Sequence, residues 1–110
     1  MKIIGCDFHP SWQQIAVFDA ETGELSEFKL VNGDGEAERF YRAVEAPALV
    51  GIEACGNSQW LIDLLLRLGH EVWVGAAAPP GTSLRLTMPS SLSRATRHAR
   101  RCATTNVDEV

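Results

Sequence analysis

The sequence lacks the long apolar run of a membrane-spanning helix and the paired cysteines of a secreted domain. No stretch reaches the ~18 consecutive apolar residues that a span requires, because Asp63 and Arg67 interrupt the longest candidate, Trp60–Leu68. The cysteines number three, an odd count without C-x-x-C spacing, and no signal peptide is recognisable. These absences predict a cytoplasmic chain with reduced thiols and no membrane partner.

Basic charge is scarce in the first two thirds of the chain. Residues 1–75 carry five basic and twelve acidic residues, a balance of −7, whereas residues 76–110 carry five arginines, no lysine and two acids, a balance of +3. An acidic body is not typical of a simple nucleic-acid-binding protein. It is compatible with an enzyme that holds Mg²⁺ through its acids. With 110 residues and 45% hydrophobic content, the chain is long enough for one small domain.

Apolar periodicity predicts five strands and two helices before Gly75. A short apolar run followed by two alternating segments, joined by short turns, indicates a three-stranded antiparallel meander. A spacing of three to four then indicates two helices around an apolar strand. Pro47 ends the first helix, Asn57 or Ser58 caps the second, and Gly69 ends it. The predicted strands are residues 2–7, 14–19, 25–31, 49–53 and 71–74.

The predicted order β-β-β-α-β-α-β is the layout of an α/β, RNase H-like mixed sheet. In that layout the first strand is central and the fourth lies parallel beside it, so their carboxyl ends meet at one edge. Asp7 ends the first strand and Glu53 ends the fourth. Neighbouring acids repel unless a cation or proton lies between them, and acids at strand ends are a common divalent-metal site. Asp7 and Glu53 are therefore the predicted metal-binding residues, and the resemblance described below implies that they are also catalytic.

The periodicity stops after Gly75. Residues 76–110 are rich in Ser, Thr, Arg and Ala, and this composition predicts an irregular or disordered basic tail after a folded domain at residues 1–75. A weak basic helix over Ser91–Cys102 is the alternative. The same composition is typical of GC-rich coding DNA read out of frame, which motivates the hypothesis of a frameshift after Gly75. Retranslation of the other frames beyond codon 75 tests it, and the idea fails if neither frame continues the fold.

Two motifs resemble the DEDD-type insertion-sequence transposases, the RuvC-like enzymes that include the pilin-gene invertases. Residues 4–9 (IGCDFH) resemble the opening of that family, and residues 50–57 (VGIEACGN), followed by a Leu-rich helix, resemble its second motif. The resemblance covers residues 1–75. It implies that Asp7 and Glu53 are the first two of four acids that hold Mg²⁺ for cutting and rejoining DNA. It also implies DNA and guide RNA as partners of the intact enzyme, and an oligomer.

The remainder of the family pattern is missing from the sequence. No D-x-x-D pair follows residue 75, since Asp108 and Glu109 are adjacent, and no domain with a nucleophilic serine follows. Pro10-Ser11 stands where the family often carries a lysine. The resemblance therefore implies a truncated N-terminal fragment with little or no catalysis of its own.

Other interpretations stay open. A non-enzymatic remnant or regulator would pair with full-length transposase. An actin/hexokinase-type ATP-binding half-domain has the same core layout, although its phosphate-binding turn is usually glycine-rich and residues 8–11 contain no glycine. Asp7 and His9 are also explained as turn residues, and Glu53 as a favourable charge at a helix N-terminus. The three tryptophans are explained as packing residues.

Overall fold

The computed structural model describes residues 1–54, 58–75, 92 and 94–100. The predicted order of strands and helices is present, and a further helical segment follows, residues 92 and 94–100, here called the tail helix. No helix in the described ranges is long and apolar enough to cross a membrane. The labelled elements are β1 (Lys2–Phe8), β2 (Trp12–Asp19), β3 (Leu25–Val31), α1 (Glu36–Ala43), β4 (Leu49–Ala54), α2 (Gln59–Arg67) and β5 (Glu71–Val74).

The five strands form one mixed sheet in the order β3-β2-β1-β4-β5. The meander β1-β2-β3 is antiparallel, whereas β1 pairs with β4, and β4 with β5, in parallel. The prediction of a central first strand with the fourth strand parallel beside it is confirmed. The β2 strand begins at Trp12, two residues earlier than the alternation had indicated.

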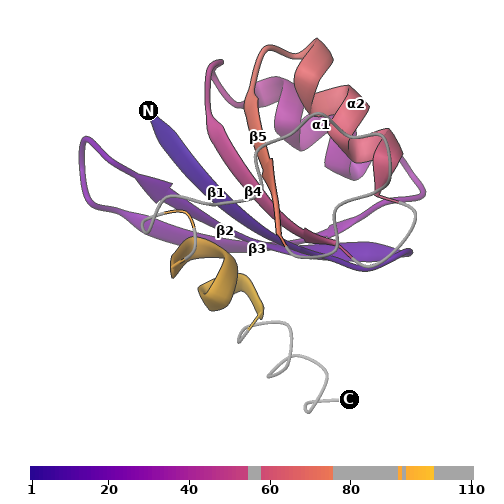
Figure 1. The fold of residues 1–110 in the computed structure, drawn as a ribbon, viewed down its shortest axis with the longest axis horizontal. Coiled ribbons are helices and arrows are strands. Elements are labelled where there is room, and N and C mark those ends of the chain that lie inside the picture. Colours follow the sequence, from indigo (N-terminus) through magenta and orange to yellow (C-terminus); the bar gives the residue numbers. More distant parts are fainter. Residues whose placement is uncertain (55–57, 76–91, 93, 101–110) are drawn as a thin grey trace.

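Helices α1 and α2 cover one face of the sheet (Figure 1). Alternate residues of β1 point into this layer because successive strand side chains face opposite ways. As predicted, Gly69 follows α2 in the left-handed region, with φ of 87°, and its N–H donates to the Leu66 carbonyl at 3.1 Å. The fully buried large side chains of this layer include Ile4, Phe8, Ile15, Tyr41, Val50, Ile52, Leu61, Ile62, Leu65 and Val74.

A buried polar network crosses this core at Gln13 of β2. Its Oε1 accepts hydrogen bonds from the Tyr41 hydroxyl at 2.8 Å and from the Cys6 thiol at 3.4 Å. Its Nε2 donates to Asn32 Oδ1 at 2.8 Å, and Asn32 Nδ2 donates in turn to the His9 carbonyl at 2.8 Å. The network joins β1, β2 and α1 to the loops that follow β1 and β3. It therefore holds in place the chain around the carboxyl end of β1, where Asp7 lies.

The buried Cys6 thiol makes stability sensitive to alkaline pH. Burial raises the pKa of Cys6 far above its usual value, so the folded thiol stays protonated while the unfolded thiol ionises near pH 8.5. Because the unfolded state then binds fewer protons, the free energy of unfolding falls above about pH 8.5, by up to ~1.4 kcal/mol per pH unit. Urea unfolding across about pH 7.5 to 9.5 measures this slope. Cys6→Ala is expected to flatten it, and identical slopes in both proteins would refute the assignment.

The tail helix covers the opposite face of the sheet (Figure 1). Its buried residues recur at a spacing of three to four, which places them on one side of the helix. Leu92 and Ala95 form a second apolar cluster with Ile3 and Trp73 of the sheet. The buried residues of the tail helix are Leu92, Ala95, Thr96 and Ala99.

This packing corrects the prediction of an irregular tail for the residues that the structure describes. The alternative of a weak basic helix is present at residues 92 and 94–100. Composition favoured an irregular tail because most of the buried residues of this helix are small. The alanine side chains of Ala95 and Ala99 are only weakly hydrophobic, and the exposed Arg97 lies between them. The remaining tail positions, 76–91, 93 and 101–110, lie outside the described residues.

Candidate functional site

The sheet brings together the two acids that the sequence singled out. Asp7 and Glu53 are partners in the parallel register of β1 and β4, and each is the last residue but one of its strand. Residues opposite each other in a parallel pair point to the same face, so both carboxylates project on the tail-helix face. The Asp7 side chain is 16% exposed and the Glu53 side chain 33% exposed, so the pair lies at a rim that solvent reaches.

The turn after β1 supplies a partner for Asp7. His9 Nε2 lies 3.2 Å from Asp7 Oδ2, and the imidazole stacks on the Trp12 ring with centroids 4.2 Å apart and planes 16° apart. Lys29 Nζ lies 4.6 Å from the centroid of the same Trp12 ring. The sequence explained His9 as a turn residue. In the structure His9 is an oriented neighbour of the Asp7 carboxylate.

Arg100 of the tail helix brings a positive charge to Glu53. Its guanidinium nitrogen Nη2 forms an ion pair with Glu53 Oε1, across 47 positions of sequence. A second contact from the same helix joins His98 Nε2 to Glu27 Oε1 on β3. Because these side chains are partly exposed, each pair contributes at most ~1 kcal/mol to stability. Sequence reasoning missed Arg100, since it had considered the arginines only as a set.

Two glycines explain how the tail helix comes so close to the acids. Gly5 and Gly51 are register partners, and each precedes its acid by two residues. A Cβ on Gly5 would lie 2.2 Å from the carbonyl carbon of Ala95, and one on Gly51 would lie 2.7 Å from Leu92 Cγ. The pair forms a groove, here called the glycine groove, that admits the helix backbone. A glycine inside each apolar strand was the available sequence signal, because such glycines often mark close approach.

The described residues do not fit a two-metal centre. No group of three or more His, Cys, Asp or Glu side chains that could hold a metal gathers among them. Two metals a few ångströms apart need several oxygen ligands each, whereas Asp7 and Glu53 offer two carboxylates and Arg100 adds a competing cation. Asp7 and Glu53 could supply two oxygen ligands to a single hydrated Mg²⁺, in competition with Arg100 at Glu53. Asn57, Asp108 and Glu109 lie outside the described residues.

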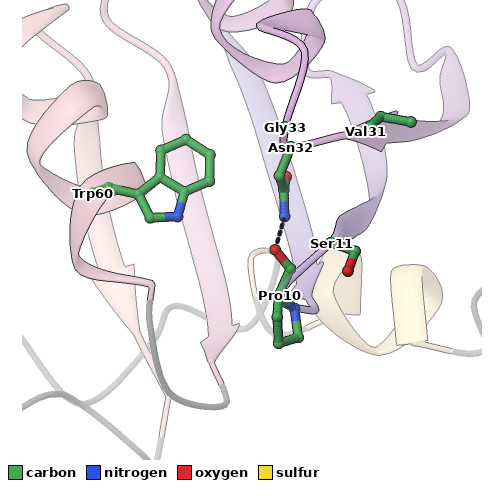
Figure 2. A pocket seen from close by; sticks show the side chains of 6 residues that line it. All are labelled: Pro10, Ser11, Val31, Asn32, Gly33 and Trp60. Atoms are coloured by element: carbon green, nitrogen blue, oxygen red, sulfur yellow. Dashed lines mark hydrogen bonds between the residues drawn. The ribbon is translucent and has the colours of Figure 1, made fainter.

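A shallow pocket of about 560 Å³ opens at the loops after β1 and β3 and at the first turn of α2. Figure 2 shows Trp60 across the opening from Pro10 and Asn32, where Asn32 Nδ2 donates to the Pro10 carbonyl at 3.2 Å. Trp60 is 40% exposed and contacts Phe8 with ring centroids 5.9 Å apart. The other lining residues are Ser11, Val31 and Gly33.

Comparisons with models of protein families, with curated proteins and with solved structures gave no match to this chain.

Proposed function

We propose that residues 1–75 are the N-terminal RNase H-like part of a DEDD-type transposase, related to the pilin-gene invertases. The intact enzyme would cut and rejoin DNA with Mg²⁺, with DNA and guide RNA as partners. The register pairing of Asp7 with Glu53 carries the proposal, since the carboxyl ends of central strands are where α/β sheets bind their ligands. The strand order with β1 central and the two sequence motifs around these acids support it.

The chain by itself is proposed to be catalytically inactive. Asp7 and Glu53 would supply half of a four-acid set, and the partner that Glu53 has is the cation Arg100. Without ligands for a second metal, no strand-cleavage step can be assigned to the described residues. Asp7 and Glu53 are expected to hold Mg²⁺ weakly.

A metal titration tests this site directly. We expect weak Mg²⁺ binding by calorimetry or NMR, lost in Asp7→Asn and in Glu53→Gln. Arg100→Gln is expected to tighten the binding by up to roughly fivefold, because it removes a competing charge worth at most ~1 kcal/mol. Arg94→Gln removes the same charge from an exposed position of the tail helix and is the matched control. Binding that persists in both acid variants would reject the site.

A nuclease and strand-transfer assay with Mg²⁺ tests the proposed inactivity of the chain. The expected result is no turnover above that of Asp7→Ala. Turnover that Asp7→Ala abolishes would support the proposed transposase class and would reject the proposal that the chain is inactive by itself. Calorimetry with ATP belongs to the same series, since saturable heat with ATP and none with Mg²⁺ alone would favour the ATP-binding alternative.

The contact between Arg100 and Glu53 favours a second function, a non-enzymatic regulator that pairs with full-length transposase. An arginine that pairs with Glu53 would compete with a metal ion for that carboxylate. The contact is therefore compatible with a protein whose function does not require a bound metal. Co-purification with an intact family transposase, retained in Asp7→Ala, is the expected result for such a regulator. Absence of a complex with the unaltered chain would reject it.

A further inference from the structure

The β3 strand is an open edge of the sheet with an unusual amount of exposed apolar surface. It is the outermost strand on one side of the sheet, and among the described residues it pairs with β2 alone. Leu25, Phe28 and Val31 are 47%, 42% and 43% exposed, which makes half of the six large apolar residues that are exposed in the described ranges. An edge strand offers a row of backbone donors and acceptors to another strand, and exposed apolar side chains strengthen such pairing.

The sequence of β3 is complementary to itself when two copies run antiparallel about Phe28. In that register Leu25 of one copy faces Val31 of the other, and Glu27 faces Lys29. These four residues share the tail-helix face, as the pairing of Glu27 with Ala16 and of Lys29 with Gln14 shows. Phe28 faces its own counterpart on the other side, where it already contacts Phe40 of α1 at 5.3 Å between centroids.

Neighbouring registers are worse matched. A shift of the pairing by two residues places Glu27 opposite Glu27 or Lys29 opposite Lys29, and like charges directly opposite each other destabilise a strand pair. A shift by one places Glu27 opposite Phe28 or Leu30 and loses the ion pairs. The register centred on Phe28 joins opposite charges and apolar residues together, with two Glu–Lys pairs per dimer because of the two-fold symmetry.

We propose that β3 pairs antiparallel with β3 of a second copy of this chain, centred on Phe28, and so joins two five-stranded sheets into one. The occupant is a second copy because the charge and apolar patterns are self-complementary. The pairing buries Leu25, Phe28 and Val31. A lysine on an edge strand normally discourages pairing with another strand, but in this register Lys29 lies opposite Glu27 of the second copy. The proposal does not depend on the proposed transposase function.

Charge reversal on the full chain tests the register. Sedimentation velocity across the micromolar range is expected to show the unaltered chain passing from monomer to dimer. Glu27→Lys and Lys29→Glu each place two like-charged pairs in the interface and are expected to raise the dimer Kd by about tenfold or more. An equimolar mixture of these two variants restores opposite charges at both pairs. It is therefore expected to dimerise at least as tightly as the unaltered chain.

Two further variants keep this test decisive. The double variant Glu27→Lys with Lys29→Glu swaps the charges and is expected to recover the dimer, whereas Glu45→Lys, at an exposed position after α1, should leave it unchanged. Circular dichroism verifies that each variant is folded, which matters because Glu27 also contacts His98. A monomeric unaltered chain, single variants that dimerise normally, or a mixture that stays monomeric would each overturn the proposal.

Discussion

Gly5→Ala is expected to detach the tail helix from the sheet. The added methyl group would lie 2.2 Å from the carbonyl carbon and 2.3 Å from the carbonyl oxygen of Ala95, distances that no rotamer change relieves because these are backbone atoms. Overpacking of this kind costs typically 1–3 kcal/mol, and about that loss in the free energy of unfolding is expected. Trp73 packs in the cluster with Leu92 and Ala95, so its fluorescence should shift to the red as water reaches it.

Two other glycines supply the controls for this experiment. The three atoms nearest to a Cβ on Gly51 all belong to the Leu92 side chain, which can rotate, so a smaller loss in the free energy of unfolding is expected for Gly51→Ala. Gly33→Ala meets no atom within 4 Å and should change nothing. The measurements are urea unfolding and Trp73 emission in a background with Trp12→Phe and Trp60→Phe. If Gly5→Ala behaves like Gly33→Ala, the helix does not lie in the glycine groove.

Gln13→Leu is expected to lower the free energy of unfolding by about 3 kcal/mol, since each buried polar group left without a partner costs ~1–3 kcal/mol. The change removes the acceptor of the Tyr41 hydroxyl and the Cys6 thiol, and the donor to Asn32. This is a large share of the 5–15 kcal/mol that typically stabilises a small domain. Urea unfolding, with circular dichroism as the signal, measures the loss.

A double-mutant cycle separates the network from simple packing. Tyr41→Phe alone is expected to cost about 1 kcal/mol, and it should cost less when Gln13→Leu is already present, because both partners are then apolar. Gln59→Leu replaces an exposed glutamine of α2 and should stay within ±0.5 kcal/mol. Additive losses across the cycle would show that Tyr41 and Gln13 do not act together.

The elements of the sheet were predictable because their signals are local. An uninterrupted apolar run marks β1 and β4, a period of two marks β2 and β3, and a spacing of three to four marks α1 and α2. The order of these elements therefore follows from residues that are neighbours in sequence. The pairing of Asp7 with Glu53 was predictable for a related reason. Each ends an apolar strand, and parallel neighbours place their carboxyl ends at one edge.

The tail helix, the glycine groove and the Gln13 network were not predictable in the same way. Arg100 and Glu53 are 47 residues apart, and Tyr41 and Gln13 are 28 apart, so no local period records their contact. Gln13 was not singled out because the predicted strand began at residue 14. In the structure Gln13 lies inside β2, and its buried side chain accepts hydrogen bonds from buried donors. Small residues such as Ala95 give a helix face that composition alone does not reveal.

The sequence by itself determined the five strands and two helices before Gly75, and that an acid lies at the carboxyl end of two of the strands, because strand and helix patterns are properties of neighbouring residues. The tertiary structure alone decided what surrounds those acids. It placed the tail helix in the glycine groove, Arg100 at Glu53 and His9 at Asp7, because close approach and charge pairing depend on where distant segments meet in space.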